Sequence, residues 1–243
     1  MYEDHIEKEV DDATYYAERR KKRKRRNTIF LIGIIGLVVF AVIATIIVVT
    51  YISERGKEQV MRKPIIYLYA DKALEVSVKL DFDGVTCTYP EYNEGGWNVT
   101  AYPDGTLIDP KGNEYGYLFW EGKTKAEFDF SKGFCIKGSD TAEFLRWALS
   151  EQGLTPREYN DFIVYWLPLM QDNAYNIISF QGEIYEQIAP LTITPAPDSI
   201  KRVFMAYYPS DSEKEITPQT LTGFDRSGFT VVEWGGTCVS GGK

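Results

Sequence analysis

The strongest hydrophobic pattern in the chain is an uninterrupted apolar run of 25 residues, Thr28 to Ile52, without a charged side chain. A helix rises about 1.5 Å per residue, so this run reaches roughly 37 Å. That length crosses a hydrocarbon core of about 30 Å with some tilt. The run therefore predicts one transmembrane helix, with a polar tail before it and a larger domain after it.

Beyond residue 62 the pattern changes to short runs typical of strands. From Leu74 to Phe82 apolar and polar residues alternate strictly, as in a half-buried strand. Runs rich in β-branched and aromatic residues predict further strands at 65–69, 86–89, 97–102, 106–108, 115–120, 134–136, 162–167, 177–180, 191–194, 200–207 and 229–234. The segment 97–120 is predicted to form a three-stranded meander.

Two helical patterns lie among these strands. An apolar stripe at helical spacing falls between Asp140, a predicted cap, and Gly153, a predicted stop. Thr155 to Glu158 has a cap residue, a proline at the first helical position and an acid at the third, so a second short helix is predicted there. We expect an α+β, β-rich fold: a β-sandwich-like domain with a helical insertion, preceded by one transmembrane helix.

The charge pattern predicts how the chain crosses the membrane. Eight consecutive basic residues precede the apolar run: Arg19, Arg20, Lys21, Lys22, Arg23, Lys24, Arg25 and Arg26. Basic residues beside a span remain in the cytoplasm and attract anionic lipids. The N-terminus is therefore expected inside, anchored in the membrane lipid bilayer, and the domain outside. A cleaved signal peptide is the alternative, but its apolar region is usually 7–15 residues long, so an uncleaved anchor is favoured.

These patterns divide the chain into five predicted parts. They are a cytoplasmic tail with the polybasic run (1–27), the transmembrane helix (28–52), a juxtamembrane stalk (53–62), an extracellular β-rich domain (63–236) and a flexible C-terminal tail (237–243). Nine of the 27 basic and seven of the 35 acidic residues lie in 1–27, which gives the tail +2. The remaining 18 basic and 28 acidic residues give −10, so the domain is not expected to bind nucleic acid.

The residue inventory limits the chemistry of the predicted outer domain. The only histidine is His5, in the tail, so a Ser-His-Asp triad, a Cys-His dyad and a histidine zinc site are excluded from the domain. No nucleotide-binding or calcium-binding motif is present, so no cofactor and no metal are expected. Of the three cysteines, Cys87 and Cys135 are the expected pair if a disulfide forms, which would leave Cys238 free. The alternative, three reduced thiols, stays open.

Carboxylate chemistry remains the catalytic alternative. Glu121 and Glu233 each adjoin a tryptophan at a predicted strand end. A glycoside hydrolase needs two carboxyl groups facing one cleft, with rings that stack on sugar. Most acids beside a core tryptophan are structural, so Glu121 and Glu233 are weak catalytic candidates.

Four strings, KPIIYLY (63–69), WNVTAYPDG (97–105), YLFWEG (117–122) and FTVVEWGG (229–236), resemble a group of uncharacterised bacterial exported or membrane-anchored surface proteins. The resemblance covers most of residues 63–236, with Ala70 standing where the group has proline. It implies export and the domain limits but no functional residue.

We therefore expect a single-pass, membrane-anchored extracellular domain that acts as a non-catalytic binding module at the cell surface. Its partner would be a cell-wall polymer, a glycan or a protein. The alternatives are a carboxylate-based glycan hydrolase and a membrane-assembly partner that acts through the span.

Overall fold

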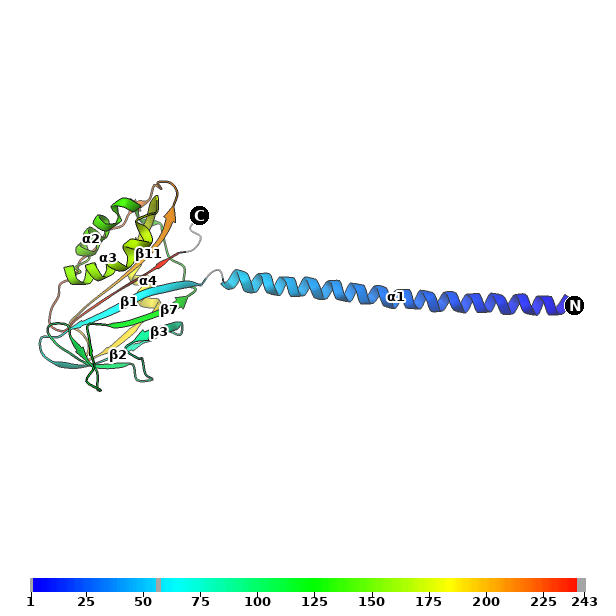
Figure 1. Cartoon of the computed structure of the whole chain (residues 1–243), viewed down its shortest axis with the longest axis horizontal. Helices are drawn as coiled ribbons and strands as arrows, with labels where there is room; N and C mark the ends of the chain where they lie inside the picture. Colours follow the sequence, from blue (N-terminus) through cyan, green and yellow to red (C-terminus); the bar gives the residue numbers. More distant parts are fainter. Residues whose placement is uncertain (1, 56–57, 240–243) are drawn as a thin grey trace. The chain divides into compact units, whose positions relative to one another are not determined.

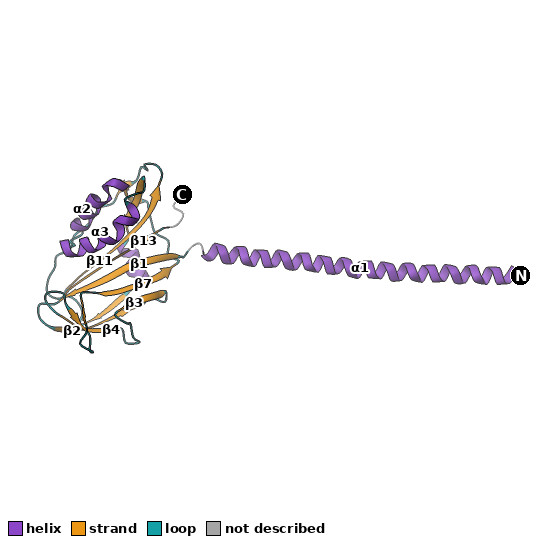
Figure 2. Ribbon diagram, viewed as in Figure 1, coloured by secondary structure: helices purple, strands orange, loops and turns teal. Residues whose placement is uncertain are grey.

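The computed structural model describes residues 2–55 and 58–239 of the chain (Figure 1). Its contacts divide the chain into two compact units, Met1–Gly56 and Lys57–Lys243. The second unit combines helices with many strands (Figure 2), so the predicted α+β, β-rich class is confirmed. Residues 56–57 of the expected stalk and 240–243 of the expected C-terminal tail lie outside the described residues.

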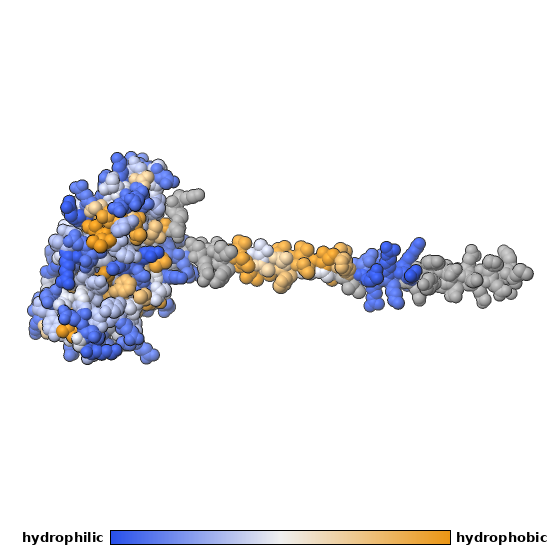
Figure 3. Space-filling model, viewed as in Figure 1, coloured by the Kyte–Doolittle hydropathy of each residue, from blue (hydrophilic) through white to orange (hydrophobic). Residues whose placement is uncertain are grey.

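The first unit is a single helix, α1 (Tyr2–Arg55). Its portion Arg19–Thr50 is long and apolar enough to cross a membrane. No other helix among the described residues meets this criterion. Figure 3 shows the apolar stretch beside the hydrophilic basic run. The hydroxyls of Thr45 and Thr50 donate to carbonyls four residues earlier, at 2.8 and 2.9 Å. These bonds satisfy the Thr45 and Thr50 hydroxyl donors inside the helix itself, as a lipid environment would require.

The second unit is built around an eight-stranded sheet in the order β12-β8-β9-β11-β13-β1-β7-β3. Its strands are β1 (Gln59–Tyr69), β3 (Val85–Tyr89), β7 (Leu118–Thr124), β8 (Lys132–Lys137), β9 (Tyr175–Phe180), β11 (Ser199–Ser210), β12 (Thr217–Pro218) and β13 (Thr230–Cys238). β13 lies at the centre, parallel to β11 and antiparallel to β1. Strand β1 begins inside the range expected to be a stalk.

A smaller sheet has the order β10-β2-β4-β5-β6. Its strands are β2 (Leu74–Leu80), β4 (Trp97–Ala101), β5 (Leu107–Ile108), β6 (Glu114–Tyr115) and β10 (Leu191–Thr194). The predicted alternation of β2 is confirmed, because Val76, Val78 and Leu80 are its buried residues. The predicted meander is wrong in its last strand: β7 leaves the smaller sheet and pairs with β1 and β3 of the larger one.

Alternating residues of the central strands give the larger sheet two buried faces. On β1, Ile66 and Leu68 join a cluster with residues of the smaller sheet, whereas Ile65 and Tyr67 join a second cluster with α2 and α3. β13 is buried along its length for the same reason. Strands covered on both faces lose the strict apolar–polar alternation, and 229–234 accordingly carries apolar residues at positions on both faces.

Helices α2 (Thr141–Glu151) and α3 (Pro156–Met170) cover one face of the larger sheet, as Figure 2 shows. The predicted first helix is confirmed, although Asp140 makes no side-chain capping bond. The predicted strand at 162–167 is wrong, because α3 continues to Met170. The buried Glu158, Phe162, Trp166 and Met170 recur every four residues, which is the helical period.

Candidate functional site

Glu233 lies inside the domain and is fully buried on β13. Its Oε2 is 2.5 Å from Nε of Arg202 on β11. Its Oε1 accepts hydrogen bonds from Nε1 of Trp120 at 3.0 Å and from the Tyr185 hydroxyl at 2.8 Å. The carboxylate is therefore saturated by a buried cation and two neutral donors.

The surroundings of Glu233 hold its partners in fixed charge states. Burial disfavours the charged Arg202 guanidinium, but the attraction of Glu233 outweighs this and raises the pKa of Arg202. Burial, followed by the Glu233 charge, raises the pKa of Tyr185 well above its ordinary value. Arg202 also lies over the Tyr185 ring, 4.4 Å from its centroid, and donates to the Ala189 carbonyl at 2.8 Å. This is the pattern of a structural ion pair.

The structure does not bring Glu121 and Glu233 into one cleft. Trp120 and Glu233 are in contact on one face of the sheet, and Glu121 follows Trp120 in β7, so its side chain points to the other face. There Glu121 accepts a bond from the main-chain N–H of Lys63 at 3.2 Å. The paired-acid arrangement of a glycoside hydrolase is therefore wrong for these residues.

The suggested disulfide is also wrong. Cys87 lies on β3 and Cys135 on β8, with β9, β11, β13, β1 and β7 between them. Neighbouring strands are about 4.8 Å apart, whereas the Cα atoms of a disulfide are within about 7 Å. Cys87, Cys135 and Cys238 are all free thiols, and Cys87 and Cys238 are exposed.

An open groove of about 710 Å³ lies beside β11. β9 ends at Phe180, opposite Met205, whereas β11 continues back to Ser199. Helix α4 (Gly182–Ile188) forms one wall, and the loop 219–224 contributes to the other. We call this cavity the β11 groove.

Two glutamines from distant segments shape one end of the β11 groove. Gln181 donates to the hydroxyl of Ser179 at 2.8 Å and accepts from the N–H of Asp129 at 3.2 Å. Gln219 accepts from the Phe180 N–H at 2.9 Å and donates to the Phe180 carbonyl at 2.7 Å. Its amide thus takes the place of a strand neighbour for Phe180.

Lys201 closes the other wall of the β11 groove. Its Nζ donates to the Thr222 carbonyl at 2.6 Å. Partial burial lowers the pKa of Lys201, and the charge of Glu186 opposes this effect. Glu183 and Glu186 of α4 also line the groove. Sequence reasoning identified none of these residues, because isolated polar residues spread over a strand, a helix and a loop form no recognisable motif.

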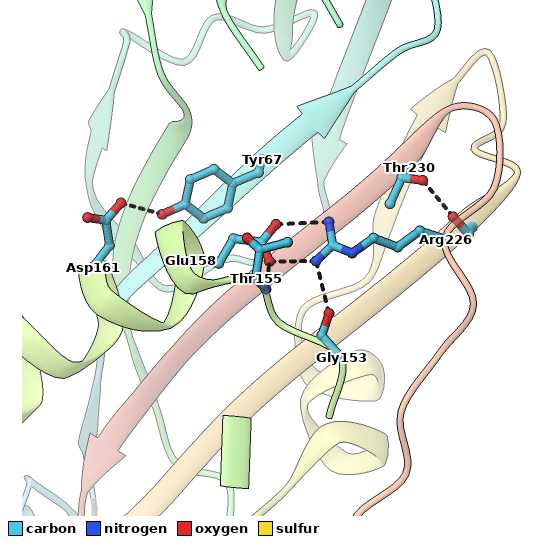
Figure 4. Close-up of polar contacts among 8 residues, drawn as sticks. Tyr67, Gly153, Thr155, Glu158, Asp161, Arg226 and Thr230 are labelled. Carbon is cyan, nitrogen blue, oxygen red and sulfur yellow. Dashed lines mark hydrogen bonds and ion pairs between the residues drawn. The ribbon is translucent and has the colours of Figure 1, made fainter. Parts of the chain in front are cut away.

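A second polar cluster lies where α3 begins, on the other face of the sheet (Figure 4). Arg226 binds the buried Glu158 carboxylate through two nitrogens, at 3.1 and 2.5 Å, and donates to the Gly153 carbonyl at 3.0 Å. Glu158 also accepts from the Thr155 N–H at 2.7 Å, which completes a capping box. Because each charge is already matched, we interpret this cluster as a clamp that holds the loop before β13 to α3.

Burial, followed by the hydrogen bond to Asp161, raises the pKa of Tyr67 beside this clamp. Its hydroxyl therefore stays protonated and donates to Asp161 at 2.8 Å. Among residues 2–55 and 58–239, no group of three or more His, Cys, Asp or Glu side chains is placed to hold a metal ion.

The chain is similar to a Butyrivibrio fibrisolvens protein described as "Uncharacterized protein in bglA 3'region", with 49% identity over 63 residues. The match covers 25% of this chain and 65% of that protein's length. No family model matches the chain. No solved structure matches it either.

Proposed function

We propose that the chain is a single-pass, membrane-anchored module whose domain faces outward and binds a ligand in the β11 groove without catalysis. The observation that carries the proposal is the groove itself: an open cavity of about 710 Å³ lined by hydrogen-bonding side chains. A large concave site with a few convergent polar groups is the default place to expect a ligand.

The anchor and its orientation belong to the same proposal. The basic run Arg19 to Arg26 directly precedes the apolar part of α1, which favours a cytoplasmic N-terminus. The resemblance to exported or membrane-anchored bacterial surface proteins supports the same arrangement. We also interpret the two sheets around their shared cluster as the sandwich-like part of the domain, with α2 and α3 as the inserted part.

The ligand classes that fit an outward domain are a cell-wall polymer, a glycan or a protein segment. The test uses the full chain in lipid nanodiscs, with purified cell-wall sacculi, an oligosaccharide panel and a displayed peptide library as probes. Thr220 lies exposed in the wall of the β11 groove, so Thr220→Trp adds a bulky ring there and narrows the groove. Thr217→Trp, on the exposed β12 outside the groove lining, is the matched control.

We expect at least one probe class to bind, with affinity reduced at least tenfold by Thr220→Trp and unchanged by Thr217→Trp. Binding that responds equally to both variants, or no binding to any of the three classes, would contradict the proposal.

A further inference from the structure

Strand β11 has an unpaired edge along the β11 groove. The Gln181 N–H donates to the Phe204 carbonyl at 2.7 Å, so the main-chain groups of Phe204 point toward β9. On the opposite side the Val239 N–H donates to the Tyr207 carbonyl at 2.7 Å. Main-chain groups alternate in direction along a strand. The N–H and C=O groups of Ile200 and Arg202 therefore point, like those of Phe204, away from β13 and toward the groove.

Nothing in the described part of the domain pairs with this edge. Strand β9 pairs only as far as Met205, and no loop or side-chain hydrogen bond between the described residues reaches the main chain of Ile200 or Arg202. The neighbouring position Phe180 is different, because the Gln219 amide satisfies both of its outward groups. The Gln219 side chain thus pairs with the edge of β9, whereas the edge of β11 at Ile200 and Arg202 has no hydrogen-bond partner among the described residues.

The dimensions of the open edge suit one extended chain. Five residues of β11, from Ser199 to Val203, precede Phe204, whose carbonyl is taken by the Gln181 N–H. At about 3.3 Å per residue they offer roughly 17 Å of edge. Gly182 at the start of α4 lies against the Arg202 carbonyl without a side chain, where an added Cβ would be 3.4 Å from that oxygen. The α4 wall therefore approaches this edge closely.

The walls indicate which side chains such a segment would carry. Ile200 is 44% exposed at the groove and offers an apolar contact. Glu183 and Glu186 line the α4 wall, whereas the Lys201 ammonium is already bound to the Thr222 carbonyl. A segment with an apolar residue and a basic residue complements these surfaces.

We infer that the β11 groove takes an extended peptide segment of a partner protein, which adds as a strand to β11 at Ile200 and Arg202. This inference rests on the proposed function and specifies its ligand. Main-chain donors and acceptors that recur every two residues match a peptide, and β-augmentation gives affinity through those bonds. A sugar chain does not carry amide groups at that repeat.

The test selects random dodecapeptides displayed on phage against the full chain in nanodiscs and synthesises the tightest binder. Ile200→Pro removes the N–H that points into the groove, while the ladder to β13 runs through the alternate residues and stays intact. Ile200→Thr keeps that N–H and is the matched control. We expect at least tenfold weaker peptide binding for Ile200→Pro, and a smaller change for Ile200→Thr.

Two measurements on the unmutated chain test the inference even if the proline variant misfolds. Amide hydrogen exchange at 200 and 202 should slow at least tenfold when the peptide binds. N-methylation of the peptide should abolish binding at alternate positions only. Unchanged exchange at both amides, or N-methyl effects without alternation, would overturn the inference.

The outcome also separates this inference from the proposed function. If Thr220→Trp weakens binding of sacculi or oligosaccharides and no peptide binds, the peptide inference fails and the groove remains a binding site. If Thr220→Trp changes the binding of no probe, the proposed function itself fails.

Discussion

At the residue scale, Glu233 stands out from the sequence as a candidate catalytic acid, but in the structure its role is structural. The sequence places acids beside tryptophans, and Trp120 does contact Glu233 across two strands. The adjacency did not reveal Arg202, which sits on β11 and turns the acid into half of a buried ion pair. Sequence neighbours could suggest the residues, but strand pairing decides which of them meet.

The Glu233–Arg202 pair makes a stability prediction. Glu233→Ala leaves the Arg202 charge buried without its counter-ion, and we expect the free energy of unfolding to fall by about 3–5 kcal/mol. Urea unfolding of the full chain in detergent micelles, followed by tryptophan fluorescence, measures this. The apolar run 28–52 contains no tryptophan, so the signal reports on the domain.

A double variant separates the charge effect from lost packing. Glu233→Gln with Arg202→Met removes both charges and keeps an oxygen that accepts from Trp120 and Tyr185. Removing both partners of a buried pair costs much less than removing one. If the double variant is as unstable as Glu233→Ala, the carboxylate contributes through its shape and not its charge.

At the scale of elements, hydrophobic period predicted most strands and the first helix because their faces are half-buried. It failed at 162–167, where β-branched and aromatic residues suggested a strand although the four-residue spacing of Phe162 and Trp166 was helical. The β11 groove was beyond prediction for a different reason. Its walls come from α4 and from the loop 219–224, and only the early end of β9 leaves space between them.

The turn between β5 and β6 gives a prediction about pH. The Asp109 carboxylate accepts bonds from the Asn113 side chain, the main-chain N–H groups of Lys111 and Asn113, and the Tyr115 hydroxyl. The Asn113 side-chain bond is the main cause that lowers the pKa of Asp109 to about 2. An aspartate in an unfolded chain titrates near pH ~3.9.

Because the folded pKa is the lower one, the carboxylate stabilises the fold above about pH 4, and this contribution disappears as the pH falls toward 2. We therefore expect Asp109→Asn to lower the urea midpoint at pH 6 and to differ little from the unmutated chain near pH 2. Asp211→Asn, at an exposed position after β11, is the control. A difference that is constant from pH 6 to 2 would exclude a charge-dependent role for Asp109.

At the scale of the whole molecule, the apolar run was the most predictable feature, because length and composition alone define a helix that can cross a membrane. The spatial arrangement of the cysteines was the least predictable feature. Cys87 and Cys135 both lie on strands as expected, but sheet order depends on contacts between distant segments and places them far apart. Because the exposed cysteines are free, labelling them can test on which side of a membrane the domain lies.

The central claim is that a retained anchor displays the domain outside the cell, and thiol labelling tests it most directly. Intact cells producing the chain are treated with a membrane-impermeant maleimide, and the purified product is analysed by intact-mass spectrometry. We predict that the exposed Cys87 and Cys238 react before lysis, on a chain that retains residues 1–50. Labelling only after the membrane is opened, or a labelled product that lacks the apolar run, would contradict the claim.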